Sequence, residues 1–218
     1  IGNLSQYVIS PFSTLFINPK NYCRMKQYIK REFLTPEEKK LIVKVKLPIA
    51  RLDRVRDIFL FSCFTGLTFD DVDKLQEYNI EILENGKRQM KIYIPLSNKI
   101  REIPLLAIPC LILDKYKGKQ SDGKLLPLSC KAAFNHNLKE IARLCGINRN
   151  LTFHLARHTF IGTVTVANGI SLKTVADILG HTQLNCIRSF IEPTNDKVQE
   201  DMAILSEKFR KIEKLFNT

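Results

Sequence analysis

The spacing of apolar residues changes at Tyr78 from the period of a helix to the period of a strand. Every second residue is apolar from Tyr78 to Ile82, Asn85-Gly86 follows, and the alternation resumes over residues 90–94. An Asn-Gly dipeptide between two alternating runs is typical of a β-hairpin. Helical periodicity elsewhere, with no strand–helix–strand repeat, predicts a mainly helical α+β fold with one small antiparallel hairpin or sheet.

Helix boundaries are marked by capping residues. Thr35 begins one helix, because Pro36 follows it and Glu38 stands three positions further on, as in a capping box. Several other helical runs end at a glycine, the residue that most often stops a helix. The remaining helices are expected at about 52–64, 70–75, 105–116, 129–145, 153–168, 171–179, 183–191 and from 195 onward.

The first 32 residues differ in composition from the rest. They contain Pro11, Pro19 and a polar stretch at 18–21 that runs into basic residues, which is typical of a linker or of the end of a preceding domain. We therefore expect residues 1–32 to be such a segment and residues 33–218 to form one domain ending in a long helix. A chain of 218 residues can bury a core without metals or disulfides.

The chain is strongly basic, with 34 Lys and Arg against 22 Asp and Glu and a net charge of +12. Much of the excess lies in residues 1–50, which hold nine basic and three acidic side chains. Such a surface attracts a large anion, and nucleic acid is the commonest one in a cytosol. A solvated basic surface without a partner is the alternative that charge alone leaves open.

No apolar run approaches the roughly 20 residues that span a bilayer. The two longest, Ile58–Phe69 and Ile103–Leu113, are interrupted by polar residues, glycine or proline. The first ten residues lack the basic start and apolar core of a secretory signal. We therefore expect a cytoplasmic protein that does not associate with membranes.

Three histidines and an arginine cluster in the last third of the chain, in His154-Leu-Ala-Arg157-His158 and Leu179-Gly180-His181. His154 and Arg157 are three apart on an expected helix, so their side chains project from one face, about 5 Å apart at Cβ. An arginine fork matches two phosphate oxygens, and a neighbouring imidazole can donate a hydrogen bond or move a proton. These residues predict a phosphate site, with His181 held just past a glycine-terminated helix and turned toward it.

Other chemistry is not favoured by these residues. A histidine here can instead bond a backbone carbonyl in the core, which is the interpretation we prefer for His158. His154 and His158 have the spacing of a zinc helix, but Leu155 stands where the general base of HExxH would be, and the six cysteines never form CxxC. No P-loop or GxSxG motif occurs. We expect neither a metal nor another cofactor.

Together, HLARHTF, SLKTVADILGHTQ and the upstream FLFSCFTGL resemble the catalytic domain of the tyrosine recombinase (phage integrase) family. The resemblance covers about residues 33–216, and the motif sequences are closest to those of integrases from Bacteroidetes mobile elements. Family members cut DNA by attack of a tyrosine hydroxyl on a phosphodiester, form a 3′-phosphotyrosyl link and rejoin it to a 5′-hydroxyl, without metal or nucleotide. The resemblance implies the family fold, double-stranded DNA as partner, and a site-specific recombinase of the bacterial cytoplasm.

The resemblance assigns roles to three residues of the cluster. His154 and Arg157 match the HxxR pair that binds the scissile phosphate, and His181 matches the second residue that hydrogen-bonds it. One position departs from the pattern, because the family's first arginine follows Thr-Gly-Leu and Thr68 stands there in this chain. Some members from conjugative elements also lack this arginine, so Thr68 alone does not imply an inactive enzyme.

A hairpin lysine protonates the leaving 5′ oxygen in the family, seven or eight residues before a strand end that resembles Ile-Pro-Leu. Ile94-Pro95-Leu96 puts Lys87 at that place. Arg88 and Lys91 are close competitors for the role. Without the resemblance, Lys87 is equally well explained as a solvated turn lysine.

The nucleophile position, nine residues beyond His181, holds Phe190. Phenylalanine has no hydroxyl to attack phosphorus, and all six tyrosines lie at or before residue 116. As written, the chain is expected to bind DNA and not to cleave it. The change keeps the ring and removes one hydroxyl, so we favour an inactivated variant of an active recombinase, engineered to trap a complex. A natural, non-catalytic DNA-binding relative of integrases is the alternative.

The last expected helix carries an apolar stripe, with residues spaced by three or four positions from Val198 to Phe216. The stripe can dock on the chain's own core or on a neighbouring protomer, and periodicity does not choose between them. Given the resemblance, we expect a homo-oligomer on DNA in which this C-terminal helix can be exchanged between protomers.

Overall fold

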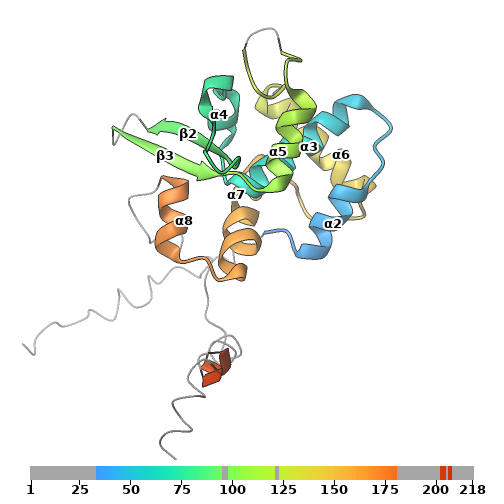
Figure 1. Cartoon of the computed structure of the whole chain (residues 1–218). Coiled ribbons are helices and arrows are strands. Elements are labelled where there is room, and N and C mark those ends of the chain that lie inside the picture. Colours follow the sequence, from blue (N-terminus) through green and yellow to red (C-terminus); the bar gives the residue numbers. More distant parts are fainter. Residues whose placement is uncertain (1–32, 95–97, 121–122, 181–201, 205, 208–218) are drawn as a thin grey trace, which may run out of the picture. The chain divides into compact units, whose positions relative to one another are not determined.

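The computed structural model of the chain describes residues 33–94, 98–120, 123–180, 202–204 and 206–207 (Figure 1). The expected linker at 1–32, His181, Phe190 and the helix expected at 183–191 lie outside these residues. Of the last helix, residues 202–204 and 206–207 are described and are helical. The described part is mainly helical with one small antiparallel sheet, which confirms the predicted fold class.

Two helices open the described part, and their ends follow the predicted caps. Helix α2 (Pro36–Lys44) begins with the capping box, in which Thr35 Oγ1 accepts from the backbone N–H of Glu38 at 3.2 Å and a Glu38 carboxylate oxygen accepts from the backbone N–H of Thr35 at 2.9 Å. Helix α3 (Ala50–Thr65) ends at Gly66, which has a left-handed φ of 72°. Local sequence chemistry therefore fixes both helices.

The hairpin is present and belongs to a three-stranded antiparallel sheet in the order β1-β2-β3. Strands β1 (Ile80–Ile82) and β2 (Arg88–Ile94) pair as predicted, with Ile80 opposite Met90. Strand β3 (Lys99–Pro104) was not predicted. It pairs with β2 and places Arg101 opposite Ile92.

The start of the hairpin differs from the prediction. Helix α4 (Phe69–Asp73) and a single 3-10 turn, η1 (Glu77–Asn79), precede β1. Tyr78 lies in that turn and is 78% exposed, so the prediction that the strand begins at Tyr78 is wrong. The Asn79 side chain donates to the carbonyl of Lys91 at 2.9 Å, and this bond ties the turn to β2.

The later helices were all predicted, apart from a change of winding in one of them. Helices α5 (Ala107–Tyr116), α6 (Lys131–Leu144), α7 (Phe153–Thr159) and α8 (Leu172–Leu179) lie within two residues of the expected starts and ends, except at the end of α7. There the chain continues as a π-helix, η2 (Phe160–Thr165), and a 3-10 turn, η3 (Val166–Asn168). The Thr165 hydroxyl donates to the carbonyl of Ile161 at 2.9 Å, and threonine bonds of this kind compete with the α-helical ladder.

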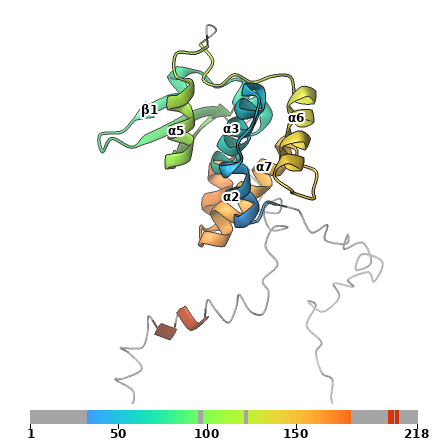
Figure 2. The same cartoon turned by 90° about the vertical axis from the view of Figure 1, so that its right-hand side faces the viewer.

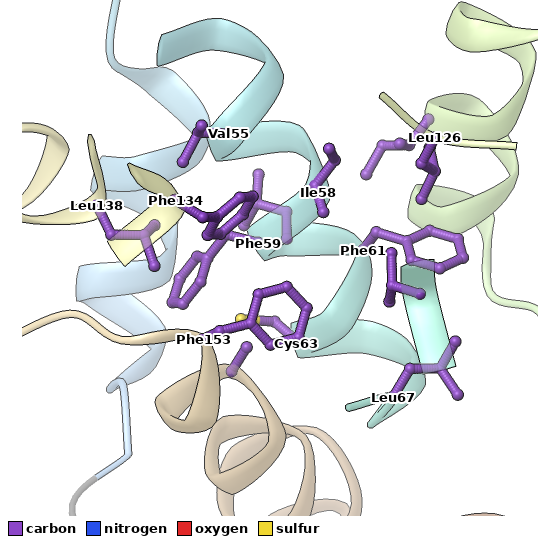
Figure 3. Packing of buried hydrophobic residues seen from close by; sticks show 14 of the residues in the cluster. Val55, Ile58, Phe59, Phe61, Cys63, Leu67, Leu126, Phe134, Leu138 and Phe153 are labelled. Carbon is purple, nitrogen blue, oxygen red and sulfur yellow. The ribbon is translucent and has the colours of Figure 1, made fainter. Parts of the chain in front are cut away.

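Helix α3 is the centre of the core, and α5, α6 and α7 pack around it (Figures 1 and 2). Figure 3 shows Phe59, Phe134 and Phe153 packed together, and all three are buried. Phe134 and Phe153 meet edge to face with ring centroids 5.3 Å apart. Burying each ring contributes about 1.5–3 kcal/mol, so this cluster fixes α6 and α7 against α3.

Helix α8 packs against β3, which brings the end of α8 to the sheet (Figure 1). Gly180 caps α8 with a φ of 70°. A Cβ on Gly180 would lie 2.7 Å from Ile94 Cδ1 and 3.4 Å from Arg101 Cδ, so only glycine fits here without displacing Ile94. Among the described helices, none has the length and apolar composition needed to cross a bilayer.

Candidate active site

The Thr-Gly-Leu turn after α3 is held tightly from both sides. A Cβ on Gly66 would lie 2.5 Å from Phe160 Cδ1 and 2.7 Å from Leu179 Cδ2. Because Gly66 also has a left-handed φ, glycine is required here for backbone conformation and for space. The turn thus brings the end of α3 against both the helix that follows α7 and the end of α8.

Arg157, in the middle of α7, joins these two helix ends. Its Nη1 donates to the Gly66 carbonyl at 2.7 Å and its Nη2 donates to the Leu179 carbonyl at 3.2 Å. The residue is only 9% exposed. Burial, together with the nearby charge of Arg101, lowers the pKa of Arg157 to about 10, and Asp71 acts in the opposite direction. The guanidinium therefore stays charged at neutral pH, fixed in orientation by two carbonyls that do not neutralise it.

His154 lies on the same side as Arg157, as the helical spacing predicted. Both residues line a pocket of about 240 Å³, together with Thr68, Lys131 and other residues near the start of α4. His154 is exposed, and its ring meets the ring of His158 edge to face at 4.2 Å between centroids. The structure thus brings His154 and Arg157 to one pocket, and His158 packs beside His154 on α7.

Thr68 is the N-cap of α4. Its hydroxyl accepts from the backbone N–H of Asp71 at 3.1 Å, and Asp71 Oδ2 accepts from the backbone N–H of Thr68 at 3.0 Å. Thr68 therefore contributes a hydroxyl and a helix start to the rim of the pocket, and no positive charge. The carboxylate of Asp71 is fixed beside it.

A second buried arginine, which the sequence did not single out, reaches the same place from β3. Arg101 Nη1 donates to the Leu179 carbonyl at 2.9 Å, so the two arginines share one acceptor. Its Nη2 lies 3.2 Å from Asp71 Oδ2. Burial raises the pKa of the Asp71 carboxyl, but bonding to Thr68 and the charge of Arg101 outweigh it, so the pKa lies below its ordinary value.

The structure does not bring Lys87 to this site. Lys87 is exposed in the turn between β1 and β2, where its backbone N–H donates to the Asn85 side chain at 3.0 Å. It lies five residues before Ile92, the partner of Arg101, and this separation is roughly 16 Å along the strand. The ends of β2 and β3 near Arg101 and Gly180 are at the other end of the sheet.

The two competitors of Lys87 are engaged in ion pairs elsewhere on the sheet. Arg88 Nη1 lies 2.6 Å from Asp114 Oδ1, and Lys91 Nζ lies 2.9 Å from Glu81 Oε2. A different lysine, Lys99, begins β3 two positions before Arg101. Ile-Pro-Leu occurs a second time at 103–105, but Lys99 lies only four residues before it, so the family spacing of seven or eight residues does not point to Lys99.

The donors of this site are the guanidiniums of Arg157 and Arg101 and the imidazole of His154. Such a set is suited to a tetrahedral anion with one net negative charge. Arginine donors bind non-bridging phosphate oxygens, and positioned cations stabilise the additional charge of a pentacoordinate phosphorus. Within the described ranges, no group of three or more His, Cys, Asp or Glu side chains is arranged to hold a metal ion.

The described part is thus a helical domain with a small antiparallel sheet and a pocket lined by a buried arginine and an exposed histidine. The model of the phage integrase family matches residues 61–196. The chain belongs to the phage integrase family.

Similar proteins agree with that membership. A tyrosine recombinase from Pseudothermotoga lettingae is 26% identical over 162 residues, which cover 71% of this chain and 54% of that protein. Tyrosine recombinase XerD from Pasteurella multocida is 24% identical over 202 residues, covering 86% and 65%. The chain thus spans between about half and two thirds of the length of these curated relatives.

Two solved structures share the fold. The XerH recombinase bound to its difH substrate superposes with a TM-score of 0.64 at 21% identity, over 81% of this chain and 55% of that chain. The Tn1549 transposon integrase in complex with circular intermediate DNA gives a TM-score of 0.61 at 16% identity, over 79% and 65%.

Proposed function

We propose that this chain is the catalytic domain of a site-specific DNA recombinase in which Phe190 replaces the attacking tyrosine. The chain then binds a DNA phosphodiester in position for cleavage without cutting it. The observation that carries the proposal is Arg157, buried and held by the Gly66 and Leu179 carbonyls at the rim of the pocket that His154 also lines. Family membership supports the same conclusion.

The proposed chemistry belongs to the form of the domain that has tyrosine at position 190. The tyrosine oxygen attacks phosphorus and loses its proton, the bond from phosphorus to the 5′ oxygen breaks, and that oxygen takes up a proton. A phosphotyrosyl ester and a free 5′-hydroxyl result. Arg157, His154 and His181 hold the non-bridging oxygens, and electrostatic stabilisation of the phosphorane is the main contribution of the site.

The proton for the 5′ oxygen comes, in this proposal, from a lysine of the sheet. Motif spacing favours Lys87, whereas the strand topology favours Lys99, which lies in β3 near Arg101. Substituting each lysine by alanine in the Phe190→Tyr background distinguishes them. Loss of cleavage that is recovered with a 5′-thiolate leaving group, which needs no proton, identifies the general acid.

The central experiment restores the hydroxyl. Phe190→Tyr is incubated with a pool of nicked duplexes of randomised sequence, and DNA that stays attached to protein on a denaturing gel is recovered and sequenced. A covalent adduct on a recurring sequence is the expected result. Its absence with every duplex contradicts the proposal that the site is competent for cleavage.

The site assignment is tested in the same background. Arg157→Ala is expected to lose cleavage by several orders of magnitude while DNA affinity falls little, because this guanidinium acts mainly on the charge formed in the transition state. The alanine variant also leaves two buried carbonyls without a donor, so Arg157→Lys is the companion variant that keeps a donor. Cleavage at the parent rate in both variants would remove Arg157 from the site.

A DNA-binding domain without catalysis is the second candidate. Thr68 favours it, since the position of the family's first arginine holds a neutral helix cap. This candidate predicts that the chain binds duplex DNA tightly and that Phe190→Tyr forms no covalent adduct on the sequence it binds best.

We also propose that the parent recombinase belongs to a Bacteroidetes mobile element, acts on DNA in the bacterial cytoplasm and assembles as a homo-oligomer there. The sequences of the motifs support the origin in a Bacteroidetes mobile element. Helix exchange between protomers is supported by Met202, which is 58% exposed on the apolar stripe of the last helix. Met202→Glu is expected to lower the oligomeric state on DNA, as measured by light scattering, and an unchanged mass contradicts the exchange.

A further inference from the structure

Strand β3 turns a charged residue inward. Arg101 is 6% exposed and Ile103 is buried, whereas Ile100, the residue before Arg101, is 62% exposed. Alternation along the strand therefore places Arg101 on the core side and an isoleucine on the solvent side. Burying an arginine costs free energy unless the buried charge has partners, so the partners of Arg101 explain why it can lie on the core side.

The partners of Arg101 bring it beside Arg157. Arg101 Nη1 and Arg157 Nη2 donate to the same Leu179 carbonyl, at 2.9 and 3.2 Å, so these nitrogens lie at most about 6 Å apart. The Arg101 side chain also lies against Gly180, the residue directly before His181. Arg101 is thus adjacent both to Arg157 and to the backbone that leads to the third predicted phosphate ligand.

Arg101 has a donor that its partners do not use. Its Nη2 is paired with the Asp71 carboxylate, which also caps α4 through the backbone N–H of Thr68, and its Nη1 donates to the neutral Leu179 carbonyl. In the part of the chain that the structure describes, Arg101 Nε is buried and has no hydrogen-bond acceptor. Arg101 therefore has one buried donor left for an anion.

Thr68 stands where the resemblance expects an arginine. The chain has none there, yet Asp71, three residues on, is paired with a guanidinium from β3. We propose, resting on the proposed function, that Arg101 replaces the missing arginine at Thr68 and donates to the bound phosphodiester beside Arg157. It is then a catalytic residue of this chain that comes from a different element of the fold.

Lys131 also lines the pocket and fits this role less well. It is exposed at the start of α6, where its Nζ lies 5.9 Å from the centre of the Phe69 ring. A solvated lysine is screened by water and salt and is free to move, whereas a buried guanidinium keeps its direction and acts in a lower dielectric. We therefore assign Lys131 to general attraction of the DNA backbone.

The test observes the arginines directly, in the chain as it stands with Phe190. The Nε–H signals of isotope-labelled arginines are followed by NMR during titration with inorganic phosphate at constant ionic strength. Arg101→Lys and Arg157→Lys assign the two signals by their loss. Arg149 is the internal control, because it also bonds a carbonyl, that of Phe33, and a carboxylate, that of Glu38.

The expected result is that the Arg101 and Arg157 signals move with one half-saturating concentration while the Arg149 signal stays still. If Arg157 moves alone, the role of Arg101 is refuted and the phosphate site of the proposed function stands. If neither moves, or all three move equally, phosphate does not bind at this site and both proposals fail.

A rescue experiment tests the replacement itself. Arg101→Met is expected to raise the half-saturating phosphate concentration about tenfold or more, the loss of one charge-assisted bond. Adding Thr68→Arg to that variant is expected to restore most of the affinity, because it returns a guanidinium to the family position. Arg149→Met lowers the melting temperature without changing affinity. A double variant no better than Arg101→Met refutes the replacement, and Arg101→Lys serves if the methionine variant does not fold.

Discussion

Gly66→Ala probes whether the turn that holds Arg157 tolerates a single methyl group. The added Cβ would lie 2.5 and 2.9 Å from ring atoms of Phe160 and 2.7 Å from Leu179 Cδ2, distances that require these side chains or the backbone to move. The left-handed φ of 72° adds a cost that does not depend on the neighbours. The backbone cost is about 1–2 kcal/mol and overpacking adds about 1–3 kcal/mol, so we expect a loss of about 2–5 kcal/mol in the free energy of unfolding.

Gly146→Ala separates the two contributions. Gly146 follows α6 with a φ of 67°, and a Cβ there would meet nothing within 4 Å. It therefore carries the backbone cost alone, about 1–2 kcal/mol. The difference between the two variants measures the packing of Phe160 and Leu179 around the turn.

Urea unfolding followed by circular dichroism gives both free energies, with the slope checked for two-state behaviour. Because the Gly66 carbonyl accepts from Arg157, Gly66→Ala is also expected to weaken phosphate binding, and Gly146→Ala is not. If Gly66→Ala is no more destabilising than Gly146→Ala, the crowding of the turn, and the argument that it fixes Arg157, are wrong.

Two further outcomes follow from buried polar groups. Tyr116→Phe removes the hydroxyl that donates to Asp57 Oδ2 at 2.9 Å in a buried position, and the expected loss is about 1–2 kcal/mol by urea unfolding; an unchanged midpoint would mean that the bond contributes nothing. Asp71 has a pKa below its ordinary value, so its contribution to stability is present above about pH 4 and is lost as the pH falls through the folded-state pKa. Asp71→Asn is therefore expected to be less stable at pH 7 and to show a flatter decline below pH 4, measured by thermal unfolding across pH, and a decline as steep as the parent's would contradict this link.

Sequence reasoning located the elements whose signals are local. The capping box at Thr35, the glycine ends at Gly66 and Gly180 and the Asn85-Gly86 turn each depend on residues within a few positions, so the chain nearby determines them. The hairpin turn shows the limit of such signals. Gly86 N–H donates to the Leu83 carbonyl at 2.8 Å, so Glu84 and Asn85 form the centre of the turn and Gly86 takes the left-handed position after it.

Strand β3 was missed because its inward face carries a charge. Hydrophobic alternation assigns Ile100 to the core, but the structure places Arg101 and Ile103 there. An inward arginine is stable only through partners far along the chain, Asp71 and Leu179, and no local pattern shows them.

The choice of acceptors for the two arginines explains how a site can be rigid before its ligand arrives and still attract that ligand. A carboxylate beside a guanidinium, such as Asp71 beside Arg101, orients the guanidinium but also offsets its charge. Backbone carbonyls orient without cancelling. The last carbonyls of a helix carry partial negative charge and lack partners within the helix, so Leu179, at the end of α8, can hold Arg101 and Arg157 at once. Because Gly180 comes next in the chain, the contact that orients the two arginines also fixes the point from which the chain continues toward His181.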